Sequence, residues 1–260
     1  MKATYAPSSN ACGPTPSHEP TVPLTDWQAG SKHLLSSIAG MAESTLHLNT
    51  ETTGTGPTIV FSHGVGSSAE IWNGWAPVLS PPYRMVAWDQ PGHGLSDHAA
   101  PEAYGPTLAY ESLNRVVGDS DEVILVGHSL GGYLSARYAI INPTRVRALV
   151  LVATGPGFRN PEALEKWNSS VRRGAEKQGR PQTLVGLHED SYVIDHLADI
   201  TCPTMVLVGS EDAAFLGATD YIEKKVPGII RCTIEGAGHM MPETHSSELA
   251  HIVKHFLGNL

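Results

Sequence analysis

The chain lacks several features that would assign it to a class at once. Only three of its 260 residues are cysteine, too few for a disulfide framework. No apolar run approaches the roughly 18 residues of a membrane span. The first 20 residues, MKATYAPSSN ACGPTPSHEP, show no apolar core of a secretory signal peptide. We therefore expect neither a disulfide-stapled module nor an integral membrane protein.

Basic residues are also in short supply. Lys and Arg number 17 against 26 Asp and Glu, giving a formal net charge of −9 with histidine counted as neutral. This balance opposes nucleic acid and anionic membrane surfaces as main partners. Hydrophobic residues make up 41% and charged residues 17% of the chain, which resembles an ordinary globular protein. The length suits one large domain or two small ones.

The three cysteines are predicted to be free thiols. Cys12 lies in the polar N-terminal stretch, whereas Cys202 and Cys232 lie in two later apolar runs. If both runs are parallel strands, the two cysteines are offset by about 10 Å along them, which is too far for a disulfide. Free thiols favour a cytoplasmic location.

The first part of the chain differs in composition from the rest. Residues 1–23 are rich in Pro, Ser, Thr and Gly and predict a flexible arm. Within residues 24–42, Leu34, Leu35, Ile38 and Met41 share one helical face and predict a short helix. We treat residues 1–43 as an N-terminal extension, whose role stays open.

From residue 44 onward, apolar runs alternate with helix-like stretches. Continuous apolar runs favour strands buried on both faces, and their alternation with helices predicts a mostly parallel central sheet with helices on both faces, an α/β fold. The predicted strands are Thr58–Ser62, Arg84–Asp89, Glu122–Gly127, Val146–Ala153, Thr204–Gly209 and Ile229–Glu235, with Thr45–Asn49 as a leading antiparallel strand. The predicted helices are 69–79, 107–118, 130–141, 214–225 and 246–257.

The alternation of apolar runs and helix-like stretches is interrupted once, between Ala153 and Thr204. A structureless loop of that length is improbable, and residues 159–190 are its polar, charged part. We interpret this segment as a small helical cap inserted over one end of the sheet, within a domain of residues 44–260.

The sharpest motif is Gly127-His128-Ser129-Leu130-Gly131. It follows a predicted strand and opens a predicted helix, which is the context that a G-x-S-x-G nucleophile elbow requires. The two glycines leave space for a strained turn at the serine, whose oxygen then projects from the end of the strand. The following amide lies at a helix N-terminus, where negative charge is favoured.

A serine needs a base and an orienting acid to act as a nucleophile. Among 13 histidines, His239 follows the last predicted strand and therefore lies at the same sheet end as Ser129. Asp212 follows another strand and is the first choice for the acid, with Glu211 as the alternative. The order Ser129, Asp212, His239 along the chain is the nucleophile–acid–base order of one fold family.

From residue 44 to 260 the chain resembles the α/β-hydrolase superfamily, as a serine-nucleophile, esterase-like member with a short cap. Four motifs carry the resemblance. They are the His-Gly loop Phe61–Gly66, the D-x-x-G-x-G-x-S turn Asp89–Ser96, the elbow at Ser129, and the Asp212…Gly238-His239 tail.

The resemblance implies a role for each matching position. Ser129 is the expected nucleophile, His239 the base and Asp212 the orienting acid. The backbone N–H groups of Val65 and Leu130 are the expected oxyanion hole. Three further residues, His63, His93 and Ser96, are expected to shape loops and turns. Neither a metal nor a cofactor is expected.

The expected reaction is hydrolysis of a carboxylic ester, thioester or lactone of a small, largely apolar molecule. Serine in place of aspartate at position 129 speaks against dehalogenase and epoxide-hydrolase chemistry. A C–C bond hydrolase, a pyruvate-eliminating lyase and a non-catalytic binding protein on the same fold remain alternatives. The expected pocket residues are His128, Phe158, Trp167, Leu187, Phe215, Met240 and Met241. Arg172, Arg173 and Arg180 either meet a substrate carboxylate or form a solvated face of the cap.

Overall fold

The central feature is a seven-stranded sheet formed within residues 46–260, the part of the chain that this computed structural model describes. The strand order is β1-β3-β2-β4-β5-β6-β7, with β1 antiparallel to β3 and all other neighbours parallel. The strands are β1 (Thr50–Thr53), β2 (Thr58–Ser62), β3 (Arg84–Trp88), β4 (Val123–His128), β5 (Val146–Val152), β6 (Thr204–Gly209) and β7 (Ile230–Ile234). The predicted α/β class and mostly parallel sheet are confirmed.

The leading antiparallel strand is present but was predicted too early in the chain. It spans Thr50–Thr53 instead of Thr45–Asn49, and it pairs with β3. The stretch before it is docked on the turn that follows β3. Asn49 donates its backbone N–H to Ser96 Oγ at 2.9 Å and its side-chain amide to Asp89 Oδ2 at 2.8 Å. These bonds fix residues 46–49 as an extended connection.

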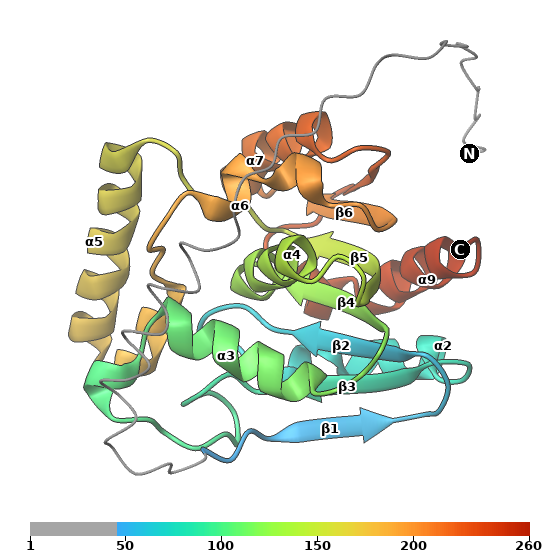
Figure 1. The fold of residues 1–260 in the computed structure, drawn as a ribbon, viewed down its shortest axis with the longest axis horizontal. Coiled ribbons are helices and arrows are strands. Elements are labelled where there is room, and N and C mark those ends of the chain that lie inside the picture. Colours follow the sequence, from blue (N-terminus) through green and yellow to red (C-terminus); the bar gives the residue numbers. More distant parts are fainter. Residues whose placement is uncertain (1–45) are drawn as a thin grey trace. The chain divides into compact units, whose positions relative to one another are not determined.

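Helices cover both faces of the sheet (Figure 1). On one face α3, α4 and α7 pack on a core that includes Leu113, Leu134 and Ile222, and on the other η1, α2 and α9 pack on a core that includes Trp72, Leu79 and Phe256. The helices on the faces are η1 (Ala69–Trp75), α2 (Ala76–Leu79), α3 (Pro106–Val117), α4 (Leu130–Ile141), α7 (Ala213–Lys225) and α9 (Ser246–Leu257). Shorter helices are η2 (Pro101–Ala103), α6 (Tyr192–Asp195), η4 (Leu197–Asp199) and α8 (Met241–Thr244).

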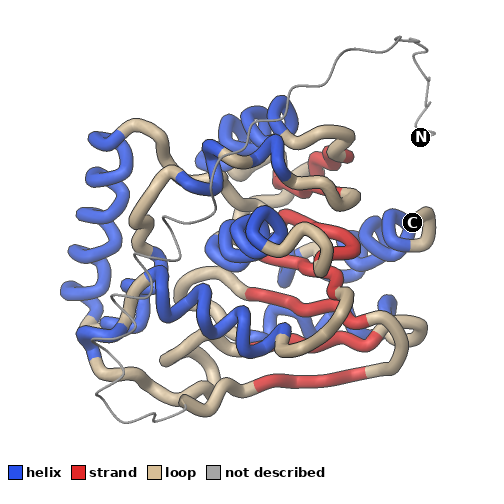
Figure 2. The backbone as a smooth tube through the Cα atoms, viewed as in Figure 1, coloured by secondary structure: helices blue, strands red, loops and turns tan. Residues whose placement is uncertain are grey.

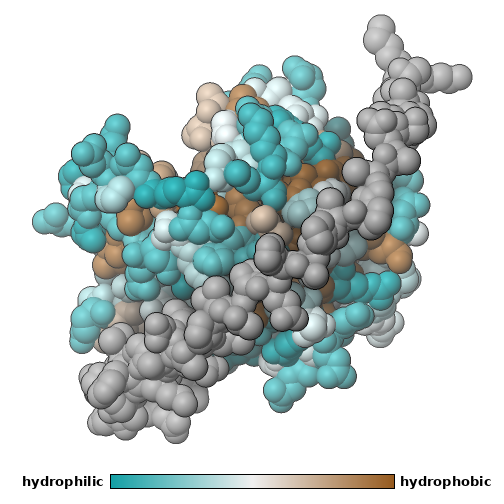
Figure 3. Space-filling view, turned by 45° about the horizontal axis from the view of Figure 1, so that its top comes forward, coloured by the Kyte–Doolittle hydropathy of each residue, from teal (hydrophilic) through white to brown (hydrophobic). Residues whose placement is uncertain are grey.

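The segment between β5 and β6 carries the long helix α5 (Pro161–Gln178) and the turn η3 (Pro181–Gly186). Asn160 caps α5 by accepting the N–H groups of Glu162 and Ala163, and Gly179 ends the helix in the left-handed conformation, with φ of 60°. The helix stands beside the ends of the strands (Figure 2), and the arrow of β2 in Figure 1 points toward it. Its outer face is mostly hydrophilic (Figure 3).

Two buried hydrogen bonds tie α5 to the chain that follows η3. Asn168 donates to the carbonyl of His188 at 2.8 Å and accepts the N–H of His188 at 2.9 Å. The indole N–H of Trp167 adds a third bond, to the carbonyl of Gly186 at 2.9 Å. These bonds hold the hydrophilic helix in place although it contributes few residues to the core.

Some predictions fall outside the described residues, namely the arm, the short helix of residues 24–42 and Cys12. Of the other two cysteines, Cys232 pairs in register with Leu207, five residues beyond Cys202, and both thiols are free. The predicted absence of a disulfide between them is therefore confirmed. Within residues 46–260 no helix has the length and apolarity that crossing a membrane requires.

Candidate active site

Ser129 occupies a sharp turn between β4 and α4. Its backbone has φ of 53°, in the left-handed region that residues other than glycine seldom adopt. The turn is possible because its neighbours lack side chains. A Cβ at Gly127 would collide with the carbonyl oxygen of Gly131, and a Cβ at Gly131 would collide with the carbonyl oxygen of Ser62. Such strain at a half-buried serine is typical of a functional position.

His239 is joined to an acidic side chain from a neighbouring strand end. Its Nδ1 lies 2.8 Å from Oδ2 of Asp212, a buried carboxylate that follows β6. The adjacent Glu211 is exposed and makes no such bond within the described residues. A carboxylate only accepts, so Nδ1 donates and Nε2 of the neutral ring keeps its lone pair. The ring of Phe215 stacks on His239, with centroids 4.7 Å apart.

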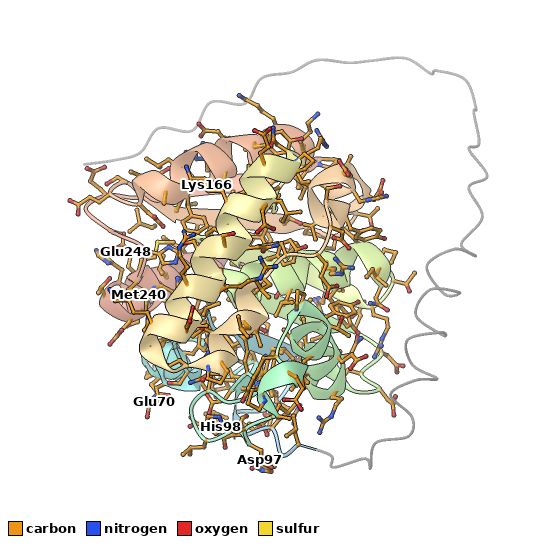
Figure 4. The ribbon with its side chains drawn as sticks, turned by 90° about the vertical axis from the view of Figure 1, so that its left-hand side faces the viewer. Glu70, Asp97, His98, Lys166, Met240 and Glu248 are labelled. Carbon is orange, nitrogen blue, oxygen red and sulfur yellow. The ribbon has the colours of Figure 1, made fainter. Side chains whose placement is uncertain are left out.

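Ser129 and His239 line the same cavity, which has a volume of about 520 Å³. Within residues 46–260 no hydrogen bond joins their side chains, a separation common in sites without substrate. The cavity is also lined by Gly64, Val65, Gly66, Ser67, Ser68, Glu70, Ile71, Gly94, His128, Arg180, Met240 and Glu243. Figure 4 looks toward this end of the sheet, with Glu70 and Met240 on the same side of α5. No group of three metal-binding side chains occurs in the described part of the chain.

The backbone at Val65 and Leu130 offers two free donors next to Ser129. Val65 lies in the loop after β2 and lines the cavity, whereas Leu130 is the first residue of α4. Neither N–H donates a hydrogen bond to any residue of the range 46–260. Glycine at position 64 lets the loop that carries Val65 lie close to Ser129, because a Cβ at Gly64 would be only 3.0 Å from Cβ of Ser129. This arrangement suits the stabilisation of negative charge on a carbonyl oxygen.

Two buried histidines hold this loop in position. His63 Nε2 accepts the backbone N–H of Gln90 at 2.9 Å, and His93 Nε2 accepts that of Gly66 at 3.1 Å. Burial lowers the pKa of His63 to about 4 and also lowers the pKa of His93. Both rings are therefore neutral at pH 7. These bonds agree with the loop-shaping roles predicted for the two residues.

Ser96 likewise serves the turn after β3. Its hydroxyl donates to the carbonyl oxygen of Asp89 at 2.7 Å. The Asp89 carboxylate accepts the N–H groups of Ala69 at 2.7 Å and Leu95 at 3.0 Å. The turn is thereby fixed to the start of η1, behind the loop that carries Val65.

His128, the residue before the serine, lies between the two halves of the site. Its Nε2 donates to the carbonyl oxygen of His239 at 2.9 Å, and its ring lies 4.8 Å from the His239 ring. Burial is the main cause that lowers the pKa of His128 to about 3. A neutral His128 avoids placing a second positive charge beside His239 when that ring takes up a proton.

Only some of the residues predicted to line the pocket do so. Met240 and His128 line the cavity at Ser129, whereas its lining does not include Phe158, Trp167, Leu187, Phe215 or Met241. Phe158 and Trp167 pack with His188 in an aromatic cluster, at centroid distances of 5.6 and 5.9 Å from the imidazole. Met241 is buried in the core at the start of α8.

The three arginines considered above as partners of a substrate carboxylate have different surroundings. Arg180 lines the cavity, whereas Arg172 is exposed and pairs with Glu165 at 3.1 Å. Arg173 is exposed on α5. A solvated face therefore accounts for two of the three, and Arg180 is the one that reaches the site.

Sequence reasoning missed several residues of the site. Thr154 donates from Oγ1 to the carbonyl oxygen of Ser129 at 2.6 Å and so supports the elbow. Gln90 donates from Nε2 to the carbonyl oxygen of His63 at 2.6 Å. Glu70 and Glu243 line the cavity. Gln90 lies inside the turn motif Asp89–Ser96 but is not one of its defining positions, and only tertiary packing brings the other three residues to the site.

Comparison with protein families agrees with this geometry. The family model described as the alpha/beta hydrolase fold matches residues 57–187, about half of the chain. The matched range contains the loop of Val65, the turn after β3, the elbow and α5. The chain belongs to the alpha/beta hydrolase fold family.

Individual relatives include esterases. A pimeloyl-[acyl-carrier protein] methyl ester esterase of Aeromonas hydrophila is 23% identical over 256 residues, covering 82% of this chain and 100% of the relative. Among solved structures, a carboxylesterase of Nitrososphaera gargenis aligns with a TM-score of 0.72 at 19% identity, covering 84% of this chain and 96% of the other. A thermophilic esterase of Thermogutta terrifontis aligns with a TM-score of 0.70 at 22% identity and the same coverage. The two structures share the fold.

Proposed function

We propose that this protein is a serine hydrolase that cleaves a carboxylic ester through an acyl-enzyme on Ser129. The observation that carries the proposal is the hydrogen bond between His239 and Asp212 in the cavity that also contains Ser129. The esterase relatives support hydrolysis of an ester bond. A thioester or lactone would follow the same chemistry.

In the proposed mechanism His239 acts first as a base. Its Nε2 takes the Ser129 hydroxyl proton as the oxygen attacks the carbonyl carbon of the substrate. Asp212 holds the imidazole in the tautomer that leaves Nε2 free and stabilises the imidazolium that forms. The neighbouring His128 is neutral, so it does not oppose this charge.

Negative charge then develops on the carbonyl oxygen. The N–H groups of Val65 and Leu130 are the proposed donors to it, and one such donor contributes a factor of about 10² to 10³ in rate. The protonated His239 passes its proton to the leaving alcohol. Water, activated by the same ring, attacks the acyl carbon and frees Ser129.

The segment 159–190 is the proposed cap of this site within a catalytic domain of residues 44–260. The role supported by the structure is to close one side of the cavity, since Arg180 directly after α5 lines it. The lining is richer in polar than in apolar side chains, so the expected preference for a largely apolar substrate needs a test of its own.

Hydrolysis of p-nitrophenyl esters with acyl lengths from C2 to C12 tests the proposal. Ser129→Ala should lose at least about 10³-fold in kcat/KM, whereas Ser170→Ala on the exposed face of α5 should keep the wild-type value. A fluorophosphonate should label the wild type on Ser129 and leave Ser129→Ala unmodified. Equal turnover by wild type and Ser129→Ala would reject the mechanism.

A further inference from the structure

The lining of the cavity at Ser129 includes one arginine, Arg180, and no lysine. Arg180 is half-buried, whereas the two acidic residues of the lining, Glu70 and Glu243, are exposed. Water screens the exposed carboxylates more strongly than the half-buried guanidinium. Among the Arg and Glu side chains that line the cavity, Arg180 is therefore the least screened.

The backbone of Arg180 is held firmly. Its N–H donates to the carbonyl of Ala175 at 2.9 Å, which closes the end of α5 around the left-handed Gly179. Its carbonyl accepts the N–H of Thr183 at 3.1 Å and the hydroxyl of Thr183 at 2.9 Å. A side chain that starts from a fixed backbone loses less entropy when it binds a ligand.

The guanidinium itself has no partner within residues 46–260. The structure gives Arg180 no ion pair and no side-chain hydrogen bond there, whereas Arg137 binds Asp190 at 3.0 Å and Arg231 binds Asp220 at 2.6 Å. Neither Glu70 nor Glu243 comes within ion-pair distance of Arg180. A partly desolvated guanidinium with five free donors favours an anion, and a carboxylate matches its planar fork.

The segment that follows Arg180 lies against the loop that carries the proposed oxyanion donor Val65, since a Cβ at Gly186 would lie only 2.8 Å from Cγ2 of Val65. Arg180 lines the same cavity as Val65 and Ser129. An anion bound by Arg180 would therefore belong to the molecule whose carbonyl group reaches Ser129.

We propose that Arg180 is a specificity-determining residue that binds a carboxylate of the substrate, so that the enzyme prefers half-esters of dicarboxylic acids over neutral esters. This inference rests on the proposed ester hydrolysis at Ser129. The exposed Glu70 and Glu243 discourage further negative charge on the substrate, which limits the preferred substrate to one carboxylate besides the ester.

Matched substrates measure the preference. Monomethyl glutarate and its neutral analogue methyl 4-carbamoylbutanoate differ only in carboxylate against amide, and the succinate and adipate pairs vary the distance. The wild type should favour the carboxylate in kcat/KM by about 10- to 100-fold for the best length, the range of a charge-assisted hydrogen bond. The preference should fall with added salt.

Variants assign the preference to one side chain. Arg180→Gln should bring the ratio of the two kcat/KM values to about 1 because the carboxylate substrate loses much more than the amide, and Arg180→Lys should keep part of the preference. Arg173→Gln removes an arginine of the same segment that does not line the cavity, and it should keep the wild-type ratio. Two outcomes would overturn the proposal: no preference in the wild type, or an equal loss for both substrates in Arg180→Gln.

Binding separates this proposal from the failure of ester hydrolysis itself. Calorimetric titration of monomethyl glutarate into Ser129→Ala should show tighter binding than for the amide, and the additional Arg180→Gln change should remove the difference. If neither ester is hydrolysed by the wild type, this titration still decides the role of Arg180. Equal binding of both compounds would reject it.

Discussion

At the scale of single residues, the proposed chemistry depends on the hydrogen bond between His239 and Asp212. An amide at position 212 would keep the shape of the side chain but could present its NH₂ to Nδ1, favouring the wrong tautomer of the ring. We expect Asp212→Asn to reduce kcat by about 10⁴-fold. The change should be measured on a short p-nitrophenyl ester, with the melting temperature recorded alongside.

Glu211→Gln is the matched control for that change. Glu211 is the neighbouring acid, it is exposed, and its backbone N–H donates to the carbonyl of Ala237 at 2.9 Å, a bond the substitution retains. Wild-type kcat is expected. A large loss of kcat in Glu211→Gln together with a small loss in Asp212→Asn would show that Glu211, and not Asp212, orients His239.

At the scale of elements, the contact between α4 and the end of β2 leaves no room for a side chain. A methyl group at Gly131 would collide with the carbonyl oxygens of Ser62 and His63 and would push the loop of Val65 away from Leu130. We expect Gly131→Ala to lose at least about 10²-fold in kcat, the effect of losing one oxyanion donor. Esterase kinetics on purified, folded protein provide the measurement.

Gly174→Ala tests the same substitution where space is open. Gly174 lies inside α5, and an added Cβ would meet no atom within 4 Å. Alanine should stabilise the helix by about 0.5 to 1 kcal/mol, without loss of kcat. Urea unfolding detects the gain, and a similar loss of activity in both variants would show that the close contact at Gly131 is not the cause.

Most elements of the sheet could be predicted because their signal is local. The strands β2 to β6 are mostly apolar runs, since both faces of a central parallel sheet are buried. The edge strand β1 (Thr50–Thr53) is exposed along its whole length and carries no apolar signal. The apolar residues just before it, Leu46 and Leu48, caused the strand to be predicted five residues too early.

Some side chains of the candidate site could likewise be predicted from the sequence, and others could not. Ser129, Asp212 and His239 follow strands that end at one edge of the sheet, so their proximity was predictable. The cavity around them was not. Its lining comes from η1, the residue after α5 and the chain near α8, and these meet only through tertiary packing. Arg180 could not be separated from Arg172 and Arg173 by sequence alone.

At the scale of the whole molecule, buried neutral histidines link stability to pH. Burial is the largest cause that lowers the pKa of His63 and His188 to about 4 and that of His128 to about 3, against 6.5 for a free histidine. At a pH between 6.5 and the lowered pKa of each ring, the unfolded chain binds protons that the folded chain does not. These groups therefore leave the folded state fully stable above about pH 6.5 and reduce its free energy of unfolding as the pH falls toward 4.

His188→Phe should weaken that dependence. The imidazole makes no side-chain hydrogen bond among the described residues, its Nδ1 is buried without a partner, and it packs edge-on against Tyr133 at 4.3 Å. A phenyl ring keeps these aromatic contacts and removes the titrating group, while Asn168 still binds the backbone of residue 188. The free energy of unfolding in urea should therefore fall less steeply between pH 6.5 and 4 than in the wild type. At pH 7 it should equal or exceed the wild-type value, because an unsatisfied polar atom is gone.

His251→Gln supplies the control for that experiment. His251 is exposed on α9, far from the aromatic cluster in the packing of the elements, so its replacement should leave the wild-type slope unchanged. If His188→Phe also keeps the wild-type slope, protonation of His188 does not contribute to acid unfolding. The dependence would then belong to the two histidines next to the site, His63 and His128, whose rings share hydrogen bonds with the loops of the candidate active site. In that case acid would disrupt the loops of the candidate active site before the segment 159–190.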